Sequence, residues 1–188
     1  MKLKSVLDLL LGSICLLIFI VPFAGLALLV KITSKGPILY WSKRVGRDNR
    51  IFIMPKFRSM RVGTPAVASH LLGQPEQYLT PIGSLLRKSS MDELPQLWSI
   101  VKGDMSFVGP RPALFNQDDL ILLRTQCGVH TLTPGLTGWA QVYGRDELSI
   151  QAKVALDLEY MNRQSMLFDG HILWRTLIKV IQRDGVSH

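Results

Sequence analysis

A long uncharged apolar run near the start of the chain limits what this sequence can fold into. No residue from Leu9 to Val30 carries a charge. As a helix, such a run is long enough to cross a hydrocarbon core of about 30 Å. Pro22 lies in its second half, where it removes a helical hydrogen bond and clashes with the preceding turn. We therefore predict a kink or break between Ile18 and Pro22.

Basic residues flank the run on both sides, with Lys2 and Lys4 before it and Lys31 and Lys35 after it. Because Lys and Arg favour the cytoplasmic side of a membrane, both flanks are expected there. A helix broken at Pro22 would enter and leave by one face, whereas a straight helix would strand one flank outside. Residues 1–35 are therefore predicted to form a re-entrant anchor, with a single kinked span as the alternative. The pattern does not fit a cleaved secretory signal.

The composition fits one globular domain, residues 36–188, beside this anchor. The 188-residue chain has a net charge of +8 and is 47% hydrophobic, which suits an anionic membrane surface and phosphorylated partners. Nucleic acid is not expected, because the basic residues are not interleaved with aromatics and no nucleic-acid-binding motif is visible. The two cysteines and four histidines show no metal-ligand spacing, which argues against a disulfide framework or a zinc site.

The pattern after the anchor predicts an α+β fold that is mostly helical. Two strand-like runs, 38–42 and 51–54, flank a turn-like stretch and predict a β-hairpin, and residues 63–80 are predicted to be a loop. Predicted helices cover 81–88, 95–102 and 112–126, and two more lie between 147 and 183, separated near 168–170. The amphipathic helices 112–126 and 173–183 could lie in the membrane interface or pack in the core.

Two adjacent carboxylates, Asp92 and Glu93, come just before Pro95. Pro95 disfavours helix at the preceding residue and suits the first turn of a new one, so the pair should lie near a helix beginning. A helix beginning attracts anions such as phosphate, provided that a divalent cation offsets the carboxylates. On a helix the two side chains would point about 100° apart, which favours two different roles, one nucleophilic and one metal-binding. Alone, such a pair is typical of a solvated helix start.

Basic and glycine-rich motifs accompany the carboxylates. Arginine binds phosphate oxygens in pairs and stays charged, so these motifs together could cradle a pyrophosphate. In Pro110-Arg111-Pro112 the two prolines restrict the backbone, which leaves Arg111 little entropy to lose on binding. By itself the tripeptide fits a rigid turn with a solvated arginine equally well. The motifs are 56–60, 87–88, 103–112 and 138–145.

Taken in order, these motifs resemble those of the bacterial sugar transferases called monotopic phosphoglycosyl transferases, in their small form. The resemblance covers nearly the whole chain. The matching stretches are 36–38, 44–47, 56–60, 91–97, 102–112, 134–138 and 141–145.

The resemblance implies that Asp92 attacks the β-phosphate of a UDP-sugar, releases UMP and holds the sugar phosphate covalently until undecaprenyl phosphate takes it. Glu93 would be the Mg²⁺ ligand. Asp157 weakly matches a further acidic position of the family, with a plain helix-surface aspartate as the alternative. The residues expected to face phosphate groups are Lys56, Arg58, Arg87, Arg111 and Arg145.

The resemblance also implies a monotopic protein of the bacterial inner membrane, with its catalytic domain in contact with lipid on the cytoplasmic face. Val21-Pro22 replaces the family's Ser-Pro pair at the helix break. The reaction would be the first membrane step of surface glycan or glycoconjugate synthesis. Downstream glycosyltransferases and a second copy of the chain are further partners that the resemblance allows.

Two other functions fit part of the pattern. A non-catalytic adaptor would dock on anionic lipid through the apolar run and the basic residues. A single-displacement transferase would use Asp92 only as a base or a metal ligand, without a covalent intermediate. No residue set identifies the sugar, although the small form of the family suggests a modified N-acetyl sugar.

Overall fold

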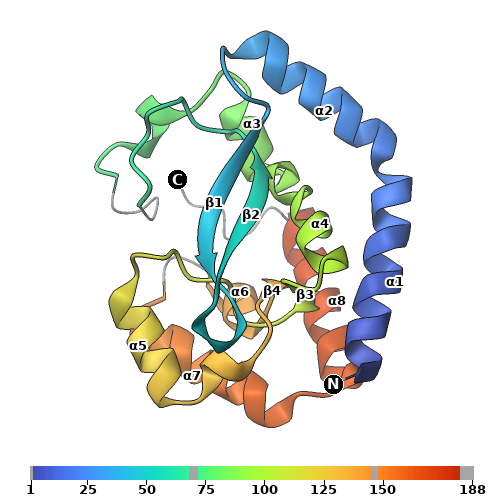
Figure 1. Cartoon of the computed structure of the whole chain (residues 1–188), viewed down its shortest axis with the longest axis vertical. Coiled ribbons are helices and arrows are strands. Elements are labelled where there is room, and N and C mark those ends of the chain that lie inside the picture. The colour runs from blue at the N-terminus through green and yellow to red at the C-terminus, as the bar shows by residue number, and fades with distance from the viewer. Residues whose placement is uncertain (1, 68–71, 145–147, 183–188) are drawn as a thin grey trace.

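The computed structural model describes residues 2–67, 72–144 and 148–182 (Figure 1). It is mostly helical, with two small two-stranded sheets. The helices and strands are α1 (Lys2–Ile18), α2 (Ile20–Thr33), β1 (Leu39–Val45), β2 (Ile51–Phe57), α3 (Gly83–Lys88), α4 (Gln96–Val101), β3 (Ser106–Val108), α5 (Asp118–Gln126), β4 (Gly135–Thr137), α6 (Trp139–Tyr143), α7 (Ile150–Arg163) and α8 (Met166–Gln182). Short 3-10 turns are η1 (Arg47–Asn49), η3 (Pro75–Tyr78), η4 (Met91–Glu93) and η5 (Val129–Thr131).

The apolar run forms two helices that meet at Phe19 with a bend of 62°. The predicted break between Ile18 and Pro22 is confirmed. Pro22 is the third residue of α2, so its missing N–H leaves the carbonyl of Ile18, the last residue of α1, without its usual helical donor. Among the described residues no single helix is long and apolar enough to cross a membrane, whereas the bent pair passes by length and composition.

Both helices of this pair pack on the rest of the protein along one side of the molecule (Figure 1). Cys15, Leu16 and Phe19 contact the cluster that includes Leu97 and Ile100 of α4. The α2 side chains contact Phe57 and Leu86, through Phe23, Leu26, Ala27 and Val30. The opposite sides of both helices are apolar and exposed, with Leu17 at 72% and Val21 at 76% of their full accessibility.

The predicted β-hairpin is present, and its strands are longer than expected. β1 and β2 pair antiparallel from Leu39 opposite Phe57 to Val45 opposite Ile51. Asp48 and Asn49 in the turn adopt positive φ angles of 54° and 59°, which Asp and Asn tolerate better than most residues. The hairpin places Lys56 on β2, opposite Tyr40 of β1.

A parallel pair of three-residue strands, β3 and β4, was not predicted. Ser106 lies opposite Gly135, and Val108 lies opposite Thr137. The backbones approach so closely that a Cβ on Gly135 would lie 2.1 Å from the backbone nitrogen of Gly109. Only glycine fits such a crossing. Gly109 and Gly138 come from two of the motifs expected to cradle phosphate, and a Cβ on Gly138 would lie 2.1 Å from the Gly109 carbonyl oxygen, so both glycines serve at least this backbone packing.

Two helix boundaries were predicted wrongly. The helix expected over 112–126 begins at Asp118, because residues 113 and 114 instead pair with the edge of β1, where Leu114 bridges to Arg44 and the Ala113 carbonyl accepts from Val45. This backbone pairing outweighs the helical pattern. Residues 72–80 of the expected loop include the turn η3.

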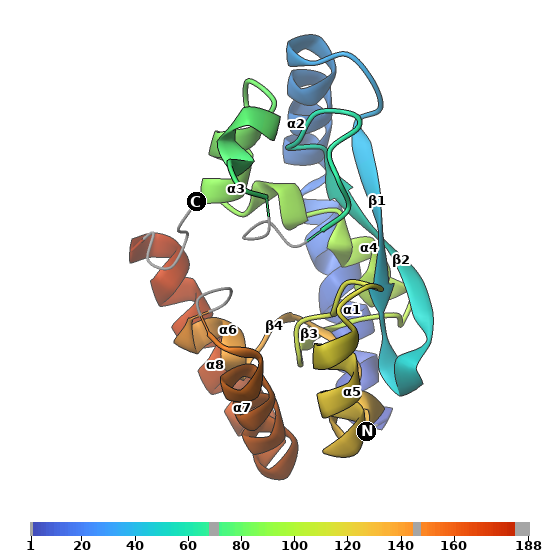
Figure 2. The same cartoon turned by 90° about the vertical axis from the view of Figure 1, so that its left-hand side faces the viewer.

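The last two helices are separated at Gln164 and Ser165 rather than at 168–170. The Ser165 hydroxyl accepts from the backbone N–H of Phe168 and so caps the start of α8. Phe168 and Ile172 then pack with Trp139 and Tyr160 in the main core. Figure 2 shows α6, α7 and α8 grouped on one side, with α1 and the hairpin on the other and β3 and β4 between them.

Candidate active site

Asp92 and Glu93 lie in the 3-10 turn η4, directly before α4. The position near a helix beginning is therefore confirmed. Ser90 enters the turn with φ at +55°, and Pro95 occupies the N-cap position of α4. This tight turn sends the two adjacent side chains to different surroundings.

Glu93 accepts from two cationic side chains that reach it from distant parts of the chain. The Glu93 Oε1 atom lies 2.8 Å from Nζ of Lys56, on β2, and 2.9 Å from Nη2 of Arg111, in the segment that follows β3. Burial alone would raise the pKa of Glu93, but the charges of Arg111 and Lys56 outweigh it and hold that pKa well below its ordinary value. Burial lowers the pKa of Lys56, with the Glu93 charge opposing this effect. Glu93 is thus ionised at neutral pH.

Asp92 is buried at 8% of its full accessibility and behaves differently. Burial raises its pKa to about 6, and the charge of Lys56 opposes this, while Glu93 adds to it. The positive charges of Arg87 and Arg111 also favour the ionised form. At neutral pH Asp92 is therefore mostly ionised, yet it is a stronger base than an ordinary carboxylate.

The structure brings together five of the predicted site residues: Asp92, Glu93, Lys56, Arg87 and Arg111. Arg87, in the last turn of α3, also lies 3.6 Å from the sulfur of Met60 through Nη1. The cluster therefore combines β2, α3, η4 and the segment after β3. Two buried or half-buried carboxylates surrounded by three cations can accept an anionic substrate and present a nucleophile to it.

Arg58 makes its hydrogen bonds at the end of α2. Its guanidinium is buried and donates to the carbonyls of Ser34 and Lys35 and to the Ser34 hydroxyl. Gly36, with φ at +122°, leaves the room that this side chain needs. Arg58 therefore fastens the end of α2, and we no longer expect it to bind phosphate. Arg145 lies outside the described residues.

Asp157 is 1% exposed, so its reading as a helix-surface aspartate is wrong. It forms an ion pair with Arg124 of α5, with 2.7 Å between Oδ2 and Nη2. Burial raises the pKa of Asp157 and the Arg124 charge opposes that rise. Sequence reasoning missed Arg124 entirely, because one arginine on a helix carries no signal of its partner 33 residues away.

The donor set fits a Mg²⁺ ion that is bound together with substrate phosphate. Mg²⁺ commonly uses one or two protein carboxylates and takes its other ligands from phosphate oxygens and water. Within the part of the chain that the structure describes, no group of three or more His, Cys, Asp or Glu side chains could hold a metal. The described side chains of this site would therefore hold a metal ion only together with ligands from substrate or water.

The sequence model of the bacterial sugar transferase family matches residues 1–183. The chain is 35% identical over 184 residues to the UDP-glucose:undecaprenyl-phosphate glucose-1-phosphate transferase of Escherichia coli K12, and 36% identical over 197 residues to the UDP-galactose-lipid carrier transferase of Erwinia amylovora. It is also 34% identical over 198 residues to the exopolysaccharide production protein ExoY of Rhizobium meliloti.

These alignments cover nearly all of the chain but different shares of the relatives. They include 94%, 96% and 97% of this chain, and 40%, 39% and 87% of the three relatives in the same order. The chain thus spans about two fifths of the length of the first two.

Proposed function

Because the chain belongs to the bacterial sugar transferase family, we propose that it moves a sugar 1-phosphate from a UDP-sugar to undecaprenyl phosphate and releases UMP. The names of relatives support this class of substrates. One from Escherichia coli is named for UDP-glucose and one from Aeromonas hydrophila for UDP-N-acetylgalactosamine, both with undecaprenyl phosphate as acceptor. The observation that carries the proposal is the buried carboxylate pair enclosed by Lys56, Arg87 and Arg111.

In the first step, a carboxylate oxygen of Asp92 attacks the β-phosphorus of the UDP-sugar. An acyl-phosphate bond forms, and the bond from that phosphorus to the oxygen bridging the α-phosphate breaks, so the electron pair leaves on UMP. The pKa of about 6 supports this role, since Asp92 is ionised at neutral pH and more basic than usual.

In the second step, an oxygen of undecaprenyl phosphate attacks the same phosphorus. The acyl-phosphate bond breaks, the Asp92 carboxylate is regenerated, and the sugar leaves as a lipid diphosphate. Lys56, Arg87 and Arg111 would offset the phosphate charges in both steps. Glu93 would hold Mg²⁺, which when bound would neutralise further charge on the pyrophosphate. Arg145 stays a predicted phosphate-facing residue.

We also propose that the helix pair is a re-entrant membrane anchor. Both of its ends are fastened to the same globular unit: Lys4 at its start ion-pairs with Asp169, and Ser34 at its end accepts from Arg58. A membrane span would put these ends on opposite sides. On α8, Trp174 and Leu177 are also exposed, at 62% and 51%, which fits contact with the membrane interface. By the charge of its flanks, the domain would lie on the cytoplasmic face of the inner membrane.

The test is UMP release by the protein in lipid nanodiscs with Mg²⁺, undecaprenyl phosphate and a panel of UDP-sugars. We expect release with one or a few sugars, no release by Asp92→Asn, and normal release by Asp119→Asn, a matched control at an exposed position of α5. Silence of folded, lipid-embedded protein across a broad panel, including N-acetylated and modified sugars, would contradict the proposal and favour a non-catalytic adaptor.

A further inference from the structure

The short segment that carries Arg111 is held through four consecutive carbonyl groups, the first of which, that of Pro110, accepts from the backbone N–H of Gly135 at 2.9 Å. The Arg111 carbonyl accepts from Arg124 Nη1 at 2.7 Å, and the Pro112 carbonyl accepts from Arg44 Nη1 at 3.1 Å. The Ala113 carbonyl accepts from the backbone N–H of Val45 at 2.9 Å. Because Pro110 and Pro112 have no N–H to donate, these carbonyl bonds are a main means of fixing the segment.

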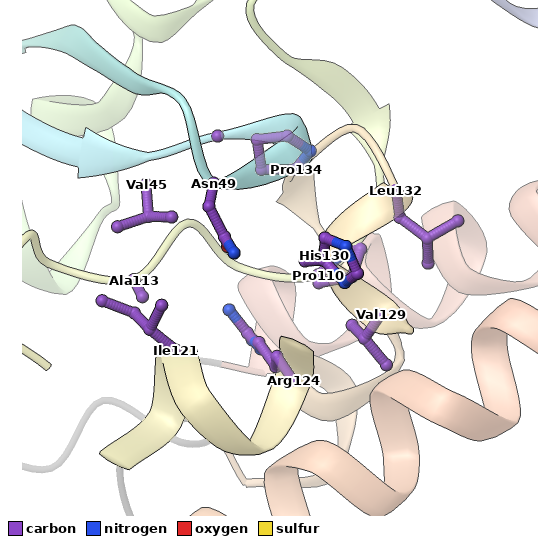
Figure 3. Close-up of a pocket in the computed structure, with 11 residues that line it drawn as sticks. Val45, Asn49, Pro110, Ala113, Ile121, Arg124, Val129, His130, Leu132 and Pro134 are labelled. Atoms are coloured by element: carbon purple, nitrogen blue, oxygen red, sulfur yellow. The ribbon is translucent and has the colours of Figure 1, made fainter. Parts of the chain in front are cut away.

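Arg124 is itself fixed in one orientation by Asp157. Its Nε and Nη2 lie 3.0 and 2.7 Å from the same oxygen, Oδ2, and the two side chains are 11% and 1% exposed. The planar guanidinium therefore uses one edge for Asp157 and directs Nη1 at the Arg111 carbonyl. Figure 3 shows Arg124 rising from α5 at the edge of a pocket, with its guanidinium end toward the segment of Pro110 and Ala113.

We propose that Arg124, held by Asp157, is a positioning residue that fixes the backbone at Arg111 and so directs the Arg111 guanidinium onto Glu93. This inference rests on the proposed function of the carboxylate pair. A buried ion pair alone adds little net stability, since the cost of removing both charges from water offsets their attraction. Arg124 also bonds the main-chain carbonyl of Arg111, and Arg111 Nη2 lies 2.9 Å from Glu93 Oε1. Through this bond the ion pair has a role in the site.

Arg124→Lys keeps the positive charge that pairs with Asp157 but removes the bond to the Arg111 carbonyl. Lysine keeps the positive charge beside Asp157, but it is shorter and has a single nitrogen, so it cannot hold the carboxylate edge and the Arg111 carbonyl as the guanidinium does. We expect UMP release per folded protein to fall about tenfold to 100-fold, the cost of a small misplacement in a catalytic site. Arg163→Lys is the matched control, because Arg163 pairs with Glu159 on the exposed side of α7, and it should keep full activity.

A double-mutant cycle with Arg111→Ala distinguishes positioning from a general structural role. Once the Arg111 side chain is gone, Arg124→Lys has nothing left to direct, so it should cost less than about twofold in that background. If the two losses multiply instead, Arg124 acts independently of Arg111 and the proposal is overturned. Should Arg124→Lys fail to fold, Asp157→Asn removes the anchor at nearly constant volume and serves in the same cycle.

A second readout needs no turnover and so separates this inference from the proposed function. The thermal midpoints of Arg111→Ala, Glu93→Gln and their double variant give the coupling between the two side chains. We expect this coupling in the wild-type background and its loss in Arg124→Lys. An unchanged coupling would overturn the positioning role. If the wild-type protein releases no UMP from any sugar, the proposed function fails, and this coupling still decides what Arg124 does.

Discussion

At the scale of single residues, Asp92 and Glu93 are neighbours whose pKa values shift in opposite directions. Burial raises the pKa of Asp92 to about 6. Glu93 is also buried, but Arg111 and Lys56 hold its pKa well below the ordinary value. Titratable groups whose environments separate their pKa values commonly divide the chemistry of a site between them. Asp92 thus suits nucleophilic attack and Glu93 a permanent negative charge.

The raised pKa predicts that Asp92→Asn stabilises the fold while abolishing turnover. The ordinary pKa of 3.8 applies to the unfolded chain and about 6 to the folded one, so ionisation of Asp92 disfavours folding. This penalty is absent below about pH 4, grows as the pH rises to about 6 and is complete above it. Asparagine cannot ionise, so the variant should gain on the order of 3 kcal/mol at about pH 7.5.

The measurement is thermal or denaturant unfolding of both proteins in EDTA, at about pH 7.5 and about pH 4. The gain should be present at the higher pH and nearly absent at the lower one. A variant that is less stable than the wild type at the higher pH would show that burial of Asp92 carries no such penalty.

For Glu93 the expected sign is the reverse. Glu93→Gln leaves Lys56 and Arg111 without their shared carboxylate, so it should lower the unfolding free energy at neutral pH by about 1–3 kcal/mol. The loss should shrink as the pH falls, because a carboxylate with a lowered pKa contributes stability only while it is ionised.

The same variant tests the metal role. Half-maximal UMP release by Glu93→Gln should require a higher Mg²⁺ concentration than the wild type. A Mg²⁺ titration in nanodiscs checks this, with removal of the metal by EDTA as the zero point. An unchanged requirement for Mg²⁺ would remove Glu93 from the metal site.

At the scale of secondary-structure elements, the break in the apolar run follows from Pro22. Replacing Pro22 by alanine restores the N–H that can bond the Ile18 carbonyl, so α1 and α2 could join into one straight helix. We predict that Pro22→Ala moves the start of α1 toward the opposite side of the membrane in part of the molecules and lowers activity in proportion.

Cysteine labelling of membrane vesicles measures this topology. In a background without Cys15 and Cys127, cysteines placed at Leu3 and at Ser34 should react from the same side in the wild-type helix pair. With Pro22→Ala, the cysteine at position 3 should react from the other side in part of the molecules. Labelling of the two positions from opposite sides in the protein with Pro22 would contradict the re-entrant anchor.

Local sequence signals predicted the elements that depend on local chemistry. The hairpin follows from strand-like runs around a turn, and the position of the carboxylate pair follows from Pro95. The boundaries of α5 and α8 were misplaced because tertiary contacts set them: Ala113 and Leu114 pair with β1, and Phe168 packs in the core. Three-residue strands such as β3 and β4 are too short to leave a periodic pattern.

At the scale of the whole molecule, distant elements meet at the site and at the anchor. Arg111 donates to Glu93 across 18 residues, and Lys56 donates to Glu93 across 37. Lys4 pairs with Asp169 near the other end of the chain. The resemblance named Lys56, Arg87 and Arg111 individually, but the Asp157–Arg124 pair that supports Arg111 needed the fold to be seen. Conversely, Arg58 shares a motif with Lys56 and yet fastens α2.

As the proposed nucleophile, Asp92 carries the sugar phosphate as a covalent intermediate. The measurement is intact-protein mass spectrometry of the protein in nanodiscs, given Mg²⁺ and its UDP-sugar but no lipid acceptor. We predict that the mass rises by one sugar phosphate, that undecaprenyl phosphate removes this addition, and that Asp92→Asn never acquires it. If UMP is released only when the acceptor is present and no adduct forms at any time, the transfer is a single displacement and the account of Asp92 is contradicted.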